Sequence, residues 1–414
     1  MHHVSGVPCS SDRKSSMSTL NPRVRAARVP RLTGPVYAYA FFEEFILLYP
    51  LYALLFTETG LGVTRLSALF VLWSSTSVAL TIPAGALADL VPRRSLLIAA
   101  PALTGSAFAL WLLTPSPWTF ALGFALWGAA GALSSGAFEA LVHSELDHRG
   151  AAHRYARVMG VVRALGVVAV GAATLLAVPV MALGGYVLIG SASVAACALC
   201  AVSALALPEH RSARPAGTST EPGYRQMLRL GPAQARDNRA VRTAVLLVVL
   251  VSAFWGALEE YVPLLAQDSG VSVGSVPLVM LTVWIGVTLG GLLAGPASAL
   301  PGRTLAVLLA LASVAIAVSA LVTGPVGWAL LGFGFGVCQM MMVVADARLQ
   351  HSITGPARAT VTSLADLGTE TLGITTFLVY AGVFTALGHG PAFALFALPH
   401  LAAAMLLVRL DRTG

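Results

Sequence analysis

Long apolar stretches are the feature of this sequence that most constrains its fold. They alternate with short polar turns, and about 20 apolar residues are what a helix needs to cross a bilayer. Twelve windows of this kind occur, at residues 36–56, 66–88, 95–114, 118–142, 156–178, 184–207, 242–266, 275–299, 303–323, 326–347, 360–386 and 391–409. Only 10% of the 414 residues are charged, against about 25% in a soluble domain. The sequence therefore predicts an all-α membrane protein with 12 transmembrane helices.

The basic residues predict how the helices are oriented. If the N-terminus is cytoplasmic, all but two of the 25 Lys and Arg residues fall on the cytoplasmic side. The exceptions are Arg65, near the outer end of the second window, and Arg163, inside the fifth. By the positive-inside rule, both termini are then cytoplasmic, and we expect a multi-pass protein of the cell (plasma or inner) membrane. The net charge of +7 is attributed to topology and anionic lipid rather than to nucleic acid.

Composition also divides the chain into segments. The polar, basic N-terminal stretch has no apolar core of a cleavable secretion signal, and Met17 is the expected start of translation. A stretch rich in Arg and Pro between the sixth and seventh windows predicts a linker with a short amphipathic helix on the inner membrane surface. The predicted segments are a disordered tail (1–34), a six-helix bundle (35–207), a cytoplasmic linker (208–240), a second six-helix bundle (241–410) and a C-terminal tail (411–414).

Two adjacent acids, Glu43 and Glu44, interrupt the first apolar window. A charge at bilayer depth costs about 2.5 to 3.5 kcal/mol on insertion scales, which favours a role in binding protons or substrate. The alternative is that one acid snorkels or pairs with a neighbouring helix. On a continuous helix, Glu44 shares a face with Tyr37, Phe41 and Leu48, and an acid bordered by aromatic rings suits a cation.

The acid pair recurs in the second half of the chain. Glu259 and Glu260 follow Glu43 and Glu44 by 216 residues, again with an aromatic residue before and a proline after. Two halves with matching polar positions are typical of transporters that bind substrate where the halves meet. We therefore expect both pairs to face a shared cavity and to bind protons and substrate.

Other charged residues lie inside the predicted spans. Ser135, Glu139 and His143 recur every four residues in the fourth window, which suggests a proton path, although ordinary hydrogen bonding between helices explains them equally well. Arg163 has a comparable depth, so we expect it to pair with Glu139, in either a structural or a coupling role. Further acids expected to act in gating or coupling are Asp346, Asp366 and Glu370.

The turn after the second window, GALADLVPRR, carries the most specific motif in the chain. It resembles the loop between the second and third helices of the major facilitator superfamily, whose pattern is Gly-x-x-x-Asp-Arg/Lys-x-Gly-Arg-Arg/Lys. The resemblance implies two six-helix bundles around a midplane cavity, with Asp89 and Arg93 in a cytoplasmic gate; a plain basic turn with a capping acid is the alternative. The matching residues are Gly85, Asp89, Arg93 and Arg94, whereas Leu90 and Pro92 depart from the pattern.

The drug/proton antiporters of that family are matched only in part. Gly166 and Gly171 resemble fragments of their fifth-helix signature, but Ala172 stands in place of its proline. In the fourth helix, Phe124 and Trp127 stand where that pattern has polar residues.

The function predicted from these features is transport. No phosphate-binding loop, nucleophile with a base, or metal-ligand set occurs, so neither an enzyme nor a cofactor or metal is expected. Embedded acids outnumber the embedded base, which favours proton-coupled efflux (antiport) of small amphiphilic or cationic compounds such as drugs or secondary metabolites. The alternative is a proton-coupled uptake symporter for a small nutrient; a non-transporting receptor has less support. The expected partners are a small-molecule substrate, protons and lipid, with no nucleic acid, and the protein is expected to be a monomer.

Overall fold

The computed structural model of the protein describes residues 30–210, 236, 238–353 and 358–411, and their regular structure is entirely helical. The first half contains α2 (Pro30–Glu44), α3 (Tyr52–Glu58), α4 (Val63–Leu90), α5 (Arg93–Leu113), α6 (Pro117–Ser134), α7 (Ala137–His148), η1 (Ala152–Arg154) and α8 (Tyr155–Leu205). The second half contains α10 (Arg239–Glu259), α11 (Val262–Asp268), η2 (Val273–Ser275), α12 (Val276–Ala297), α13 (Gly302–Ser319), α14 (Pro325–Ser352), α15 (Arg358–Leu387), α16 (His389–Ala397) and α17 (Pro399–Asp411).

The predicted spans are present, and the fifth and sixth follow one another across a kink within α8. Within the described residues, 10 stretches are long and apolar enough to cross a membrane. One of them, Ala152–Leu205, has 54 residues and bends at Gly184 and Gly185, where Gly185 has a φ of 57° that favours glycine. It therefore supplies the fifth and sixth spans. The first window is not among the 10, because it is divided between α2 and α3.

The prediction of one continuous helix through the first window is wrong. α2 ends at Glu44 and α3 begins at Tyr52. Pro50 has no amide hydrogen and its ring clashes with a helical backbone, so it excludes the intervening residues from a regular helix. The backbone N–H of Leu48, freed by the break, donates to the hydroxyl of Ser193 at 3.0 Å. Leu48 consequently does not share a helical face with Glu44.

The seventh window is broken at the equivalent place. α10 ends at Glu259 and α11 begins at Val262, directly after the acid pair. Each half follows this break with a helix of seven residues, α3 or α11, that ends in an acid. Gly60 and Gly270 come next, with φ values of 89° and 86°. The sequence repeat is therefore also a repeat of the backbone. The start of the first helix differs slightly from expectation, because α2 begins at Pro30, inside the segment expected to be a tail.

A third break corrects the expected proton path in the fourth span. α6 ends at Ser134 and α7 begins at Ala137, with Gly136 between them at a φ of 73°. Ser135 precedes the break, so it does not lie on one helical face with Glu139 and His143 as predicted. The amphipathic linker helix lies outside the described residues.

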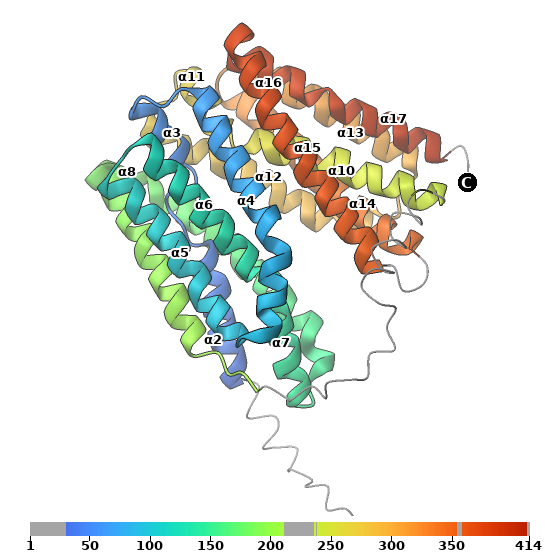
Figure 1. The fold of residues 1–414 in the computed structure, drawn as a ribbon. Coiled ribbons are helices and arrows are strands. Elements are labelled where there is room, and N and C mark those ends of the chain that lie inside the picture. The colour runs from blue at the N-terminus through green and yellow to red at the C-terminus, as the bar shows by residue number, and fades with distance from the viewer. Residues whose placement is uncertain (1–29, 211–235, 237, 354–357, 412–414) are drawn as a thin grey trace, which may run out of the picture.

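The two halves diverge from one end of the molecule to the other (Figure 1). We call the end where α2 begins and α17 ends the linker end, because the chain also leaves α8 and enters α10 there; α3 and α11 mark the far end. The halves meet along α4 with α15 and α8 with α12, and at the far end through α3 with α11. At the linker end, α7 makes its extensive contacts, among described residues, with elements of its own half.

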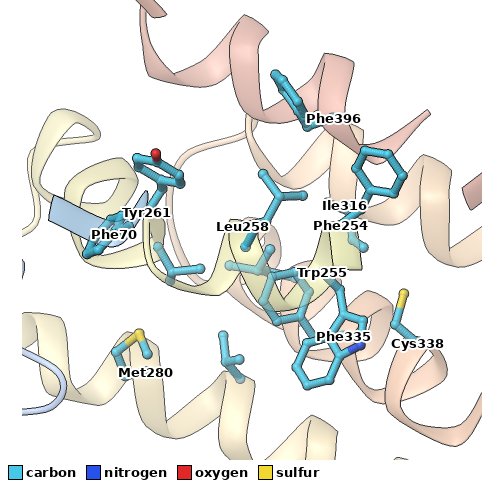
Figure 2. Close-up of a cluster of buried hydrophobic side chains, with 14 of the residues drawn as sticks. Phe70, Phe254, Trp255, Leu258, Tyr261, Met280, Ile316, Phe335, Cys338 and Phe396 are labelled. Carbon is cyan, nitrogen blue, oxygen red and sulfur yellow. The ribbon is translucent and has the colours of Figure 1, made fainter. Parts of the chain in front are cut away.

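Close helix packing and large aromatic side chains fill the interior. A Cβ added at Gly286 or Gly290 of α12 would come within 1.9 Å or 1.8 Å of a backbone oxygen of α14, so these two helices touch backbone to backbone. Figure 2 shows the core of the second half around α10, with Phe254, Trp255 and Phe335 on one side. This core holds α10 firmly up to the break at the second acid pair.

Candidate functional site

A cavity of about 180 Å³ lies inside the first half, next to the end of α2. Both acids of the first pair line it, together with aromatic rings and two thiols. All of its lining comes from the first half: Tyr39, Phe42, Glu43, Glu44, Tyr49, Ala100, Pro101, Thr104, Trp127, Ala130, Gly131, Ser134, Cys197 and Cys200. The aromatic residues predicted from a continuous helix, Tyr37 and Phe41, are not part of this wall, because the cavity faces another side of α2.

The two acids at the cavity have few protein partners. The Tyr39 hydroxyl donates to Glu43 Oε1 at a long 3.5 Å. Glu44 makes no side-chain hydrogen bond or ion pair with any residue of the described chain. A Cβ added at Gly166 would lie 3.4 Å from Glu44 Cγ, so α8 packs against the stem of Glu44 and leaves its carboxylate to the cavity.

The second acid pair has different surroundings. Glu260 follows the end of α10, and its Oε2 accepts a short hydrogen bond from the hydroxyl of Tyr52 in α3. Tyr52 is only 5% exposed, and the bond joins the two halves of the molecule. A second hydroxyl contact crosses between the halves nearby, from Tyr261 to Ser67 of α4 at 2.6 Å.

An aromatic cluster closes the far end around these bonds. Phe70 of α4 packs against Tyr261 and against Phe377 of α15, with ring centroids 5.6 Å and 5.2 Å apart. Figure 2 shows Phe70 and Tyr261 side by side at one end of the core. Tyr380 stacks on Tyr261 at 3.8 Å and bonds to His389 Nδ1 at 3.0 Å. We call the set Tyr52, Ser67, Phe70, Glu260, Tyr261 and Phe377 the far-end seal.

Glu139 and Arg163 do not form the predicted ion pair. Both side chains are exposed, and no nitrogen of Arg163 lies within 4 Å of the Glu139 carboxylate. Tyr155 lies close enough to interact electrostatically with both, and His143 packs edge-on against its ring at 5.3 Å. Because Arg163 is exposed where the halves diverge, it is not an enclosed charge that requires a partner.

The remaining predicted acids lie on the second half. Asp346 of α14 and Asp366 and Glu370 of α15 are all exposed. Asp366 is near Asp346, and Glu370 is near the hydroxyl of Ser74 in α4. The described residues contain no group of three or more His, Cys, Asp or Glu arranged to bind a metal ion.

The gate motif lies at the linker end. The guanidinium of Arg93 donates to the carbonyl of Ala140 at 3.1 Å and to the hydroxyl of Ser144 at 3.5 Å, which ties the start of α5 to α7. Nothing approaches within 4 Å of a Cβ added at Gly85, so the motif glycine makes no close helix contact among the described residues. The side chain of Asp89 lies outside the described part of the structure.

The segment after α8 forms hydrogen bonds with this loop. The sequence analysis did not predict this contact. Glu209 accepts the backbone N–H groups of Arg93 at 2.8 Å and Arg94 at 3.1 Å, and so caps the N-terminus of α5. Buried Glu145 accepts from Arg149 at 3.3 Å and from the backbone N–H of the neighbouring His210 at 2.5 Å. The only sign of this contact in the sequence is that Glu209 is acidic and that the loop at Arg93 and Arg94 is basic.

Comparison with known proteins gives one family. Residues 34–378 match the model of the Major Facilitator Superfamily, whereas no curated protein matches the sequence significantly. Among solved structures, the nucleoside transporter NupG is similar with a TM-score of 0.74 and 14% identity, over 92% of this chain and 98% of NupG. A POT family transporter in complex with 5-aminolevulinic acid gives a TM-score of 0.66 and 11% identity, over 92% and 96% of the two chains.

A bacterial homolog of the human lysosomal transporter Spinster, in an inward-facing and unoccupied conformation, gives a TM-score of 0.65 and 14% identity, over 94% and 95%. Identities this low show the fold alone, but the family model spans most of the sequence. Transport of a small molecule across a membrane, not enzymatic catalysis, is the activity of that family. This chain, with its paired halves and broken first and seventh spans, therefore belongs to the Major Facilitator Superfamily of transporters.

Proposed function

We propose that the protein is a proton-coupled secondary transporter that exports small amphiphilic or cationic compounds. The observation that carries the proposal is the acid pair at the break in each half. Glu43 and Glu44 line a cavity, whereas Glu260 is bonded across the halves to Tyr52. A binding site and a contact between the moving halves thus use chemically identical groups.

The acids supply a physical route to coupling. A carboxylate removed from water is stabilised by a proton or a cation, because either one neutralises its charge. If substrate cation and proton neutralise the same acids, each lowers the affinity for the other, which is the minimum that antiport requires. Glu44, which has no side-chain partner among the described residues, is the acid best placed for this competition in the first half, and Glu260 in the second.

Alternating access follows from the arrangement of the halves. We propose that the seal closes the outer side and that the divergence at the linker end opens the site to the cytoplasm, with both chain termini cytoplasmic in the cell membrane. Asp89 and Arg93 then act in the inner gate, and Glu139, Arg163, Asp346, Asp366 and Glu370 line the route. The segments 35–207 and 241–410 act as the two moving bundles of a monomer.

A trapped pH-sensitive dye tests the proposal. Purified protein is reconstituted in liposomes, and a panel of quaternary ammonium compounds, which do not cross as neutral bases, is added outside. Antiport makes the lumen more alkaline as substrate enters. Glu44→Gln and Glu260→Gln should each reduce the response at least about tenfold, the factor that a loss of 1.4 kcal/mol represents. Glu58→Gln, an acid of α3 outside both sites, and empty liposomes are the controls.

The solved relatives favour a second candidate, a proton-coupled symporter. The structurally similar proteins include a nucleoside transporter and a POT family transporter bound to 5-aminolevulinic acid. The same assay separates the two functions, because a symporter makes the lumen more acidic as substrate enters. Full responses from both Gln variants would contradict any coupling role for these acids.

A further inference from the structure

We propose that the cavity between α2, α5, α6 and α8 is a binding site for a small amine no larger than a single ring with a short chain. The inference rests on the proposed function and deepens it, because it names the substrate class and places the substrate's charge inside the first half. It also makes the two acid pairs unequal: the first binds the ligand and the second closes the seal.

The charge of the cavity favours a cation. Two carboxylates line it, and its wall contains no Lys, Arg or His. Glu43 has one long contact with Tyr39, and the Glu44 carboxylate has no hydrogen-bond or ionic partner within the described residues. Half-buried anions with so few partners are costly. A bound ammonium group, which donates hydrogen bonds to both acids, is therefore stabilised.

Tyr49 and Trp127 also line the cavity, and they offer a ligand one hydroxyl group and two aromatic faces. Tyr49 is half-buried and lines the cavity, yet its hydroxyl makes no hydrogen bond in the part of the chain that is described. Its ring stacks on Trp127 with centroids 5.6 Å apart. Aromatic faces attract an ammonium group by about 0.5 to 2 kcal/mol, depending on desolvation. This polar group is independent of the acids and points to the same kind of ligand.

The volume limits the size of the ligand. A cavity of about 150 Å³ in another protein holds one benzene molecule, and drug-sized ligands occupy about 300 to 1,000 Å³. At about 180 Å³, this cavity fits one ring with a short amine chain and excludes molecules of several rings. The bulky amphiphiles that a polyspecific exporter handles therefore do not fit entirely within it.

The second acid pair contributes to a contact between the halves. Glu260 is occupied by the Tyr52 hydroxyl, and the cavity wall includes no residue of the second half. The two tyrosines nearest this pair, Tyr52 and Tyr261, are both at most 5% exposed and both bonded across the halves. The first pair therefore combines carboxylates that have few partners with a neighbouring cavity, whereas Glu260 takes part in the seal.

Calorimetry with purified protein tests the chemistry, using benzylamine and its neutral analogue benzyl alcohol. We expect benzylamine to bind at least about tenfold more tightly, since 1.4 kcal/mol is tenfold in affinity. A Glu43→Gln, Glu44→Gln double variant should lose this preference, whereas Glu58→Gln, which changes an acid of α3 outside the cavity, should keep it. An amine with two or three rings should bind at least tenfold more weakly. The proposal is overturned if benzylamine does not bind at a concentration of about 10 mM, which detects only affinities of that order or tighter. It is also overturned if both variants lose the preference for benzylamine equally.

Cavity-filling variants test the location. Ala130→Leu on α6 and Thr104→Met on α5 put bulk into the cavity from two sides and should each abolish benzylamine binding. Ala129→Leu, on the same helix but outside the wall, should bind normally. Melting temperature and monodispersity show that each variant is folded, and binding retained in both filled variants sinks the assigned location.

Binding needs no gradient, so it is separable from the transport assay. Amine binding without proton-coupled flux contradicts the proposed function and leaves this site standing. Coupled flux of other compounds without amine binding contradicts this site alone.

Discussion

The two acid pairs occupy equivalent positions in the repeat, but only the second pair accepts a hydrogen bond from the short helix of the other half. Tyr52 is the first residue of α3, and it reaches across to Glu260. The first residue of α11 is Val262, which has no group to donate to Glu44. The hydroxyl of one tyrosine therefore makes one pair a contact between halves and leaves the other open to a ligand.

Tyr52→Phe should weaken the far-end seal. The variant keeps the aromatic ring and removes only the hydroxyl that Glu260 accepts, and a hydrogen bond to a charged group contributes about 1.5 to 3 kcal/mol. We expect the ratio of sealed to open molecules to fall at least about tenfold. Spin labels at Thr114 and Thr323, exposed positions of the two halves at the far end, report the change as a longer distance between them.

Tyr380→Phe is the matched control for this change. It removes an equally buried hydroxyl, but its partner His389 belongs to the same half. A shift of the label distance in Tyr380→Phe as large as that in Tyr52→Phe would show that loss of any buried hydroxyl loosens the protein. No shift in Tyr52→Phe would remove the bond as a determinant of the seal.

Hydropathy located the acids, but helical periodicity misplaced their neighbours. An acid inside an apolar window is visible in any sequence, which is why Glu43 and Glu44 could be selected. Tyr37 and Phe41 do lie with Glu44 in α2, but the cavity faces another side of that helix, and the helix ends at Glu44. Tyr49 and Tyr52 follow the end of α2, so no regular spacing relates them to the acids. In the sequence, only Pro50 indicated that the helix is interrupted.

At the scale of elements, glycines set how closely the helices pack. Gly286 and Gly290 of α12 face Gly332 and Gly336 of α14, and each would place a Cβ within 3 Å of backbone on the other helix. Glycines spaced by four residues in both helices form the stripe of small residues typical of close membrane helix contacts. The spans could be predicted because apolar length is a local property. Which helices pair, and where helices break, depends on contacts between distant residues.

Gly290→Ala should destabilise the second half. The added Cβ would lie 1.8 Å from the Gly336 carbonyl oxygen, which is backbone, so the helices must separate. Overpacking of this kind typically costs about 1 to 3 kcal/mol. Gly291→Ala is the matched control one residue on, because nothing lies within 4 Å of its Cβ. Thermal unfolding in detergent should show a lower melting temperature for the first variant only, and equal melting curves would mean that α12 and α14 adjust freely.

At the scale of the molecule, the fold could be predicted from the sequence, whereas the conformation of the two halves relative to one another could not. Twelve apolar windows predicted an all-helical membrane protein, the resemblance of the GALADLVPRR turn implied the major facilitator fold, and both are confirmed. The same windows are compatible with every state of the transport cycle, because all states use the same spans. The expected pair of Glu139 and Arg163 failed for this reason: the side chains lie where the halves diverge.

Labelling with a membrane-impermeant maleimide tests this conformation and its control by the seal. Ser135→Cys, exposed at the break between α6 and α7, should react from the linker end in the wild-type background with native cysteines replaced by Ser. Ser67→Cys, similar in size to serine and 1% exposed in the seal, should not react from either side. Thr114→Cys, exposed beyond α5 at the far end, is the control that reacts in every state.

Adding Glu260→Gln should reverse this pattern. The neutral side chain imitates a protonated acid and loses the charge-assisted part of its bond to Tyr52, so the sealed state loses stability relative to the state open at the far end. Ser67→Cys should then react from the far end and Ser135→Cys should become protected, while Thr114→Cys is unchanged. The same reversal should follow acidification of the far side without any substitution at Glu260. If both cysteines gain reactivity together, the variant has loosened the fold; if neither changes, protonation of Glu260 does not control the seal, and coupling must depend on the first acid pair alone.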